Sequence, residues 1–374
     1  EREPALYPDE LGTMYSGSAV VDFDNRSGLG DGATPPVLLY YTAQGGANAL
    51  SAGKPPVQCL AYSRDGGKTF QKYAGNPIIP RVARENRDPK VVYHAATDRY
   101  ILVLFLDKHD YELFVSDNLL DWSLFQIVTV EDEWECPDFF PLPLDGDAGK
   151  EKWVLIGAYD RYLVGSFDGT AFRAEQPVQR LHRGNASYAA QSWFNLKPGD
   201  RRRVRISWNN RPMPSAQFGL SMNAPQELTL RRIGGVMRLC AQPAEELKAL
   251  YRDTREEQAP ALPYAAPLSE AGYDLQFYLQ GNAGAKAEIA AFGLRLTADW
   301  AAGELRCGEV TAPLEADEKG RVRLRMLLDT LGAEIFVGDG QIYMTVGQIL
   351  DPNLDRLEVS GEAVRLEHVR ITQL

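Results

Sequence analysis

The chain has 374 residues, 44% of them hydrophobic, and this length allows one large β domain or two ordinary ones. Its formal net charge of −11 disfavours a nucleic-acid or polyanionic partner, which needs a basic surface, and is compatible with a neutral polysaccharide. Because no run of about 18 apolar residues occurs, no membrane insertion is expected.

The first two-thirds of the chain repeats one pattern: two strands and then a hairpin whose Asp/Gly/Asn-rich turn is followed by an aromatic residue. Hairpin residues Ser63, Ser116 and Ser166 lie 53 and 50 residues apart. This period predicts the blades of a β-propeller. The predicted elements in chain order are 16–21, 37–41 and 61–70; 87–93, 100–105 and 115–122; 135–140, 153–157 and 165–172; and 188–193, 203–208 and 219–222.

The first strand of each repeat begins with polar residues. In a propeller these strands line the central channel, so their polar starts are expected to face one funnel. Asp88 and Glu135 stand at two such starts, 47 residues apart. Converging carboxylates are what glycoside cleavage requires. Residues 1–242 are thus interpreted as a catalytic propeller domain, to which 1–15 add at most the tail of an earlier blade.

The last third of the chain reads differently. Residues 243–256 predict a short amphipathic helix with a proline near its start, and 243–260 are interpreted as a helical linker. Short alternating strands separated by turns then fill residues 261–374, which predicts a β-sandwich domain. The predicted fold is therefore all-β.

Cysteine and histidine usage argues against a metal centre. The four cysteines show no CxxC spacing, and the chain has only four histidines. No metal and no other cofactor is expected. The cysteines stand in or beside apolar runs, which predicts free, buried thiols at Cys59, Cys136, Cys240 and Cys307.

Four segments, in this order, resemble glycoside hydrolase family 32, the levanases, inulinases and invertases that cleave β-fructosides. They are residues 7–22, Arg87-Asp88-Pro89, Glu135-Cys136-Pro137-Asp138 and residues 323–336. The resemblance covers essentially the whole chain. It implies a five-bladed β-propeller, here with its first blade largely missing, followed by a C-terminal β-sandwich.

The resemblance also implies a retaining mechanism with an Asp nucleophile, a Glu acid/base and a second Asp that stabilises the transition state. Glu135 matches the acid/base, Asp88 matches the stabiliser, and Arg87 assists at the fructosyl site. Tyr15 and Ser16 match an aromatic and a hydroxyl group that contact fructose. The alternative for these two is that they are plain strand residues.

Two further aromatic residues are candidates for substrate binding. Sugars present C–H faces, so Trp134 is a candidate wall for the ring, with simple packing as the alternative. Tyr159 stands at the end of a channel-adjacent strand and is a candidate substrate contact.

The chain departs from the family at two places. The nucleophile segment, Trp-Met-Asn-Asp-Pro-Asn-Gly, lies upstream of residues 7–22 in the family, and these 374 residues do not contain it. The resemblance is therefore to an N-terminally truncated member without a nucleophile. The short match at Asp351-Pro352-Asn353 falls in the predicted sandwich and is attributed to chance. Residues 186–191 replace a family Asp-Phe-Tyr-Ala segment and lose its acid.

The resulting hypothesis is a hydrolase of β-fructosidic bonds in fructans or sucrose. Its partner would be a fructan or another fructose-containing oligosaccharide, and the family resemblance implies a secreted or periplasmic location. The alternatives are a non-catalytic fructan-binding protein and a fructosyltransferase. The residues do not choose between levan, inulin and sucrose, between exo- and endo-action, or between oligomeric states.

Overall fold

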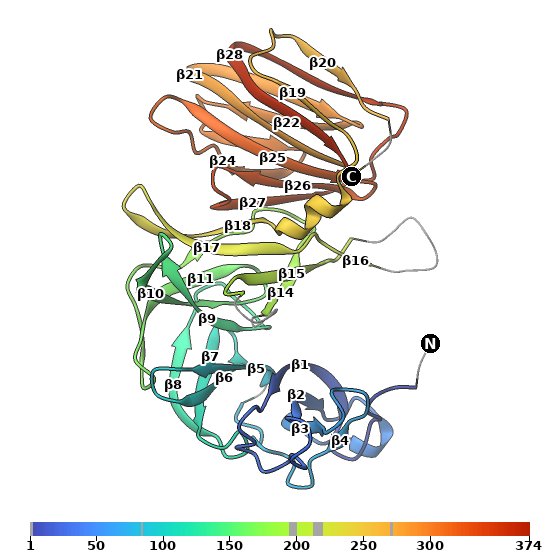
Figure 1. Cartoon of the computed structure of the whole chain (residues 1–374), viewed down its shortest axis with the longest axis vertical. Coiled ribbons are helices and arrows are strands. Elements are labelled where there is room, and N and C mark those ends of the chain that lie inside the picture. The colour runs from blue at the N-terminus through green and yellow to red at the C-terminus, as the bar shows by residue number, and fades with distance from the viewer. Residues whose placement is uncertain (1–2, 84, 194–199, 212–219, 270–271) are drawn as a thin grey trace. The chain divides into compact units, whose positions relative to one another are not determined.

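The computed structural model describes residues 3–83, 85–193, 200–211, 220–269 and 272–374, and strands dominate it (Figure 1). The chain divides into two compact units. Unit 1 comprises residues 1–143 and 147–179, and unit 2 comprises residues 144–146 and 180–374. Across the described ranges, none of the helices has the length and apolar character needed to cross a membrane.

Unit 1 contains three of the predicted repeats, and in each of them strands that follow one another in sequence are hydrogen-bonded neighbours; the first two are four-stranded sheets, and the third belongs to a 10-stranded sheet. The first sheet is β1 (Thr13–Val21), β2 (Val37–Gln44), β3 (Val57–Ser63) and β4 (Gln71–Lys72), with a 3-10 helix, η1 (Ala49–Ser51), between β2 and β3. The second is β5 (Arg87–His94), β6 (Arg99–Asp107), β7 (Asp110–Ser116) and β8 (Ser123–Thr129). The third is β9 (Asp138–Leu144), β10 (Asp147–Ile156), β11 (Arg161–Phe167) and β12 (Phe172–Ala174).

Strand β6 shows why the middle strands read as unbroken apolar runs. Side chains alternate between the two faces of a strand. Leu102 and Leu104 pack in a core with residues of the first sheet such as Leu38, while Ile101 and Phe105 pack in a second core with residues of the third sheet. Because both faces of the second sheet are buried, polar alternation is absent from this strand.

Strands β1 and β5 each carry a β-bulge at their polar starts. The bulge of β1 lies between Met14 and Gly17 and holds Tyr15 and Ser16. The bulge of β5 lies between Arg87 and Lys90 and holds Asp88. An extra residue in a bulge bends the strand and re-aims its side chains. The backbone therefore singles out the positions at which the sequence places its site candidates.

Unit 2 begins with the fourth repeat: β14 (Tyr188–Trp193), β15 (Arg203–Asn209), β16 (Ser221–Met222), β17 (Gln226–Ile233) and β18 (Val236–Pro243). Strand β13 (Gln179–Arg180) stands where the two units divide. Of the predicted strand at 219–222, residue 219 lies outside the described residues. Strand β14 has its own bulge, in which Ala189 takes a φ of 51°. Asp88 of β5 has a φ of 66°, so the last repeat keeps this backbone form without the acid.

The rest of unit 2 is a sheet folded around one apolar core. Its long strand β21 pairs with β25 through its first half and with β22 through its second, and a register shift between Gly281 and Lys286 separates the halves. A long strand that passes from one layer to the other is typical of β-sandwich corners. The strands are β19 (Thr254–Glu257), β20 (Tyr264–Pro267), β21 (Tyr273–Ala291), β22 (Leu294–Asp299), β23 (Glu304–Cys307), β24 (Val310–Pro313), β25 (Arg321–Asp329), β26 (Gly332–Val337), β27 (Ile342–Gly347) and β28 (Arg356–Gln373).

The predicted helix at 243–256 is wrong over its second half. The structure has a short 3-10 helix, η2 (Glu245–Leu250), and residues Thr254–Glu257 form β19, which pairs with β28. The ladder offered by β28 outweighs the weak helical preference of this segment. The domain boundaries 1–242, 243–260 and 261–374 stay predictions.

Candidate functional site

Arg87, the first residue of β5, joins carboxylates that are distant in sequence. Its Nε donates to Oε1 of Glu135 at 3.1 Å, and its Nη2 contacts the same oxygen. Its Nη1 contacts Glu85, and its Nε lies 4.0 Å from Oδ2 of Asp88. The prediction that the acids of two successive repeats converge is therefore met in unit 1.

Asp88 is buried beside this cluster, with 7% of its surface exposed. Its Oδ2 accepts the main-chain N–H of Cys136 at 3.0 Å, and the Cys136 thiol approaches the same oxygen at 3.5 Å. Burial raises the pKa of Asp88, and the Cys136 N–H and the Arg87 charge act against this rise. Asp88 is thus a desolvated carboxylate held in one orientation.

A buried hydrogen-bond chain, missed in the sequence, fixes the backbone of Asp88. The N–H of Asp88 donates to Oγ1 of Thr42 at 2.9 Å, and Thr42 donates to Oε1 of Gln58 at 2.8 Å. Gln58 in turn donates to the carbonyl of Asn86 at 2.9 Å. The first sheet therefore supports the bulge of the second. The polar pair Thr42 and Gln58, inside strands that are otherwise apolar, was the available signal.

Glu135 lies in the segment between β8 and β9. Glu135 and Cys136 both have positive φ, 43° and 40°, a left-handed turn that non-glycine residues rarely adopt. The hydroxyl of Tyr111 donates to the carbonyl of Glu135 at 3.3 Å. Strained backbone of this kind clusters at functional sites.

Arg87 gathers three carboxyl groups around one positive charge. One guanidinium faces the carboxylates of Glu85, Asp88 and Glu135. If all three were ionised, this group would carry a net charge of −2. Neighbouring carboxylates disfavour one another's charge, whereas the guanidinium between them favours it, so Arg87 is what allows these acids to lie close together.

Two aromatic rings pack against the cluster: Phe105 contacts the Arg87 guanidinium, and Trp134 contacts Phe105. The guanidinium carbon of Arg87 lies 5.1 Å from the ring centroid of Phe105, and the Phe105 and Trp134 rings are 5.4 Å apart. Trp134 is half-buried against the core shared by the second and third sheets. The packing interpretation of Trp134 therefore has direct support, while its contact with sugar stays a prediction. The role of Phe105 had no sequence signal beyond its place in an apolar strand.

The remaining candidates, Tyr159, Tyr15 and Ser16, lie on segments that contact those carrying the cluster. Tyr159 is 46% exposed, and the N–H of its neighbour Ala158 donates to the carbonyl of Trp134 at 3.0 Å. Tyr15 is 51% exposed, and Ser16 is also exposed, both in the β1 bulge. Ser18 of β1 accepts the N–H of Val91 of β5, so these strands are neighbours. The structure thus places Tyr15 and Ser16 on the adjacent strand rather than in the Arg87 cluster.

Comparison with known proteins now places the chain. The model of the "Glycosyl hydrolases family 32 N-terminal domain" matches residues 1–243. The chain belongs to glycosyl hydrolase family 32.

Relatives of this family 32 chain agree with the match. It is 30% identical to a levanase of Bacillus subtilis (strain 168), over 91% of this chain and 57% of the levanase. It is also 30% identical to an extracellular exo-inulinase of Aspergillus ficuum, over 93% of this chain and 78% of the inulinase. The chain thus spans less than two thirds of the levanase and more of the inulinase.

Solved structures share the fold. The exo-inulinase of Aspergillus awamori superposes with a TM-score of 0.81 and 23% identity, covering 96% of this chain and 83% of that one. The β-fructofuranosidase of Schwanniomyces occidentalis gives a TM-score of 0.81 and 20% identity over the same shares. The predicted all-β fold, a propeller followed by a sandwich, is confirmed.

The four cysteines of the family 32 chain are free. Cys59, Cys240 and Cys307 are buried as predicted, whereas Cys136 is half-buried and contacts Asp88. Burial raises the pKa of the Cys136 thiol, and the nearby carboxylates add to this rise. Cys136 is therefore a neutral neighbour of the acids. Within the described part of the chain, His, Cys, Asp and Glu side chains form no group of three or more that could hold a metal ion.

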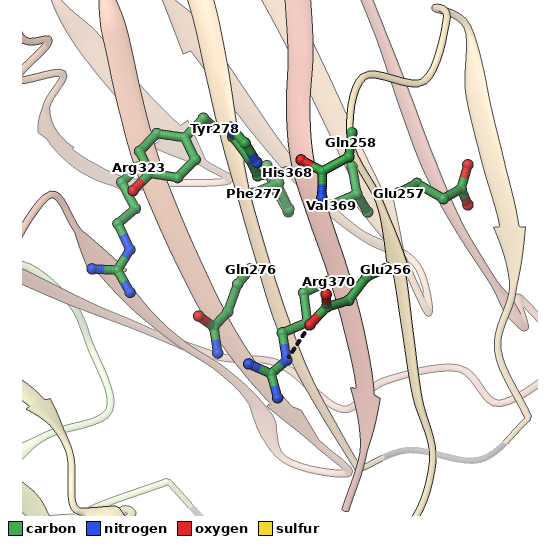
Figure 2. Close-up of a pocket in the computed structure, with 10 residues that line it drawn as sticks. All are labelled: Glu256, Glu257, Gln258, Gln276, Phe277, Tyr278, Arg323, His368, Val369 and Arg370. Atoms are coloured by element: carbon green, nitrogen blue, oxygen red, sulfur yellow. Dashed lines mark ion pairs between the residues drawn. The ribbon is translucent and has the colours of Figure 1, made fainter.

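A separate pocket lies on the sandwich strands β19, β21, β25 and β28 of unit 2 (Figure 2). Arg370 pairs there with Glu256 at 3.5 Å, and the rings of Tyr278 and His368 meet edge to face, 5.8 Å apart. The residues predicted to act on a sugar do not line it. We therefore assign the Arg87 cluster of unit 1, and not this pocket, as the candidate site.

Proposed function

We propose that this chain provides the acid/base and the transition-state-stabilising groups of a retaining glycoside hydrolase that cleaves β-fructosidic bonds. One observation carries the proposal: Asp88 and Glu135, from successive repeats, meet at Arg87, and Asp88 accepts the N–H of Cys136. The relatives support it. They include levanases and exo-inulinases, and solved fructofuranosidases of Schwanniomyces occidentalis are complexed with fructosyl-erythritol, fructosylnystose and fructose.

In this proposal Glu135 protonates the oxygen that leaves the fructosyl carbon. This step needs the protonated form of Glu135, which Arg87 holds in place beside Asp88. Asp88 acts as a carboxylate. Its negative charge stabilises the positive charge of the oxocarbenium-like transition state, and this interaction is stronger because Asp88 is buried.

The substrate-binding groups are assigned to the rim of the same site. Arg87 orients the acids and assists at the fructosyl position, and the exposed Tyr15, Ser16 and Tyr159 provide aromatic and hydroxyl contacts. Trp134 contributes its edge while its ring packs on Phe105. We also propose a secreted or periplasmic location, because several relatives are named extracellular exo-inulinases.

In this proposal the nucleophile belongs to a family segment that is not among these 374 residues. We therefore expect sugar binding from this stretch and hydrolysis only from a protein that also carries that segment. Fructose release from levan, inulin and sucrose by both forms is the first measurement. Clear release by the 374 residues alone would require a different nucleophile and a new assignment of roles.

The decisive variant is Glu135→Gln in the protein that carries the nucleophile segment. We expect fructose release to fall by about 100-fold or more, since general-acid catalysis contributes about 10² to 10⁴ in rate. The matched control is Glu131→Gln, an exposed glutamate in the same segment, which should keep full activity. Undiminished turnover by Glu135→Gln would refute the assignment. Binding of oligofructose without turnover would favour a fructan-binding protein, and fructosyl transfer at high sucrose a transferase.

A further inference from the structure

Glu133 stands two residues before Glu135 and is fully buried. In sequence it looks like its exposed neighbours Glu131 and Asp132. Its carboxylate instead accepts three main-chain N–H groups. Oε1 accepts from Trp134 and from Tyr159, each at 2.8 Å, and Oε2 accepts from Arg161 at 2.6 Å.

These bonds join two segments that are separate in sequence. Trp134 belongs to the segment before β9, whereas Tyr159 lies between β10 and β11 and Arg161 begins β11. The N–H of Ala158 donates to the carbonyl of Trp134 at 3.0 Å, which adds a direct link. A carboxylate has only acceptors, so it suits a site with three converging donors. Glu133 is thus the common anchor of the two segments.

Gly157, Tyr111 and His109 pack closely around Glu133 or hydrogen-bond to its segment. A Cβ atom on Gly157 would lie 2.4 Å from Cγ of Glu133 and 2.4 Å from the hydroxyl of Tyr111, so only glycine leaves room. The same hydroxyl donates to the carbonyl of Glu135 at 3.3 Å. A ring nitrogen of His109 pairs with the carbonyl of Glu133 at 2.9 Å. The backbone on both sides of Glu135 is therefore fixed.

We propose that Glu133 is a positioning residue that sets Glu135 and Tyr159 at a fixed separation for catalysis. It acts through the backbone and has no assigned contact with sugar. This inference rests on the proposed function of Glu135. Its physical basis is that catalysis demands near-ångström placement, and misplacement by about 1 Å can cost about 100-fold in rate.

The test compares Glu133→Gln with Glu133→Met in the protein that carries the nucleophile segment. The amide of Gln has a single acceptor oxygen, so at least one of the three N–H groups loses its partner. Met offers no strong acceptor and leaves all three unpaired. We expect kcat to fall by about 10-fold in Glu133→Gln and by about 100-fold in Glu133→Met, with KM within about twofold.

Glu112→Gln is the matched control. Glu112 on β7 is also fully buried, and burial raises the pKa of both carboxyl groups to about 7. Within the described ranges, neither oxygen of Glu112 has a hydrogen-bond partner, so it anchors no segment. We expect this variant to keep kcat and KM. Equal losses in Glu112→Gln and Glu133→Gln would attribute the effect to neutralising a buried acid and would overturn the proposal.

The outcomes separate this inference from the proposed function. An active wild type, an inactive Glu135→Gln and a fully active Glu133→Gln would overturn only the role of Glu133. A wild type that neither binds nor cleaves fructosides would overturn the proposed function and, with it, the inference. If the Glu133 variants do not fold, Gly157→Ala places a Cβ against the same side chain and against the Tyr111 hydroxyl, and we expect the same selective loss of kcat. Unchanged kcat in that variant would also overturn the proposal.

Discussion

The main-chain N–H of Cys136 donates to Oδ2 of Asp88 at 3.0 Å, across 48 residues of sequence. Because Cys136 directly follows Glu135, this bond couples the positions of the two proposed catalytic acids. It also orients the Asp88 carboxylate without neutralising it. A substitution at Asp88 that keeps an acceptor for this N–H therefore changes the charge of one acid and leaves the position of the other in place.

Asp88→Asn is such a substitution. The amide keeps an acceptor for the Cys136 N–H but removes the charge. We expect fructose release to fall by about 100- to 1000-fold, as when one preorganised electrostatic contact is removed. Stability should hold or rise, because burial disfavours the charged form of Asp88. Kinetics and thermal unfolding of the protein with the nucleophile segment provide the check.

The control for this prediction is Asp24→Asn, whose carboxylate is largely exposed and makes a 3.6 Å ion pair with Arg26. It should change neither quantity measurably, since exposed ion pairs contribute about 0 to 1 kcal/mol. Full activity in Asp88→Asn would show that its charge is not used.

Arg87→Lys tests the bridge between carboxylates. A guanidinium can contact Glu85 and Glu135 at once, and its flat face lies against Phe105, whereas an ammonium group offers neither geometry. We expect at least about tenfold weaker oligofructose binding, measured by calorimetry on the 374-residue chain. Arg99→Lys, in an exposed pair with Asp117, is the control and should bind like the wild type. Equal affinity in both variants would contradict a binding role for Arg87.

Thr42→Val tests the buried support of Asp88. Valine has nearly the same shape but leaves the N–H of Asp88 and Oε1 of Gln58 without Thr42. Unpaired buried polar groups cost about 1 to 3 kcal/mol each, so we expect unfolding free energy to fall by at least about 1 kcal/mol. The control is Thr129→Val, whose hydroxyl bonds to Asp110 at the surface. If the unfolding free energy falls no more than in Thr129→Val, the hydrogen bonds of Thr42 do not stabilise the position of Asp88.

The strands could be predicted from sequence because their cause is local. The run at residues 100–105 is apolar at each position since β6 is buried on both faces. The convergence of Asp88 and Glu135 could be predicted because blade repeats bring equivalent positions together, while their catalytic roles stay a prediction. The helix at 243–256 failed in its second half because its competitor is a ladder with β28, whose paired residues, from Thr254↔Thr372 to Glu257↔Val369, are 118 to 112 positions apart in the chain.

The supporting residues could not be predicted, because their partners are set by tertiary structure. Glu133 and Glu131 look alike in sequence, and only the N–H groups of Tyr159 and Arg161, 26 and 28 residues away, distinguish them. The positive φ of Asp88 carries no glycine to signal it. Sequence therefore identified the proposed acids and missed the groups that hold them.

Glu112 provides a prediction on pH. Burial raises its pKa from an ordinary value of 4.5 to about 7, so the folded state binds its proton more tightly than the unfolded state. The stabilisation from this proton is fully present below pH 4.5 and is lost as pH rises through 7. The whole shift corresponds to up to about 3 kcal/mol. Denaturant unfolding of the 374-residue chain at a series of pH values measures it.

Glu112→Gln isolates this contribution from those of other groups, Glu133 among them, whose pKa is also raised to about 7. The amide stays neutral at every pH. We therefore expect the unfolding free energy of the variant to be equal to or below that of the wild type near pH 4. The difference between variant and wild type should then shift in favour of the variant as the pH rises to 8. The difference between the two curves, and not either slope alone, carries the prediction, because shared groups cancel in it. Parallel curves would mean that Glu112 is solvated in solution, and that its carboxylate meets water which lowers the cost of its charge.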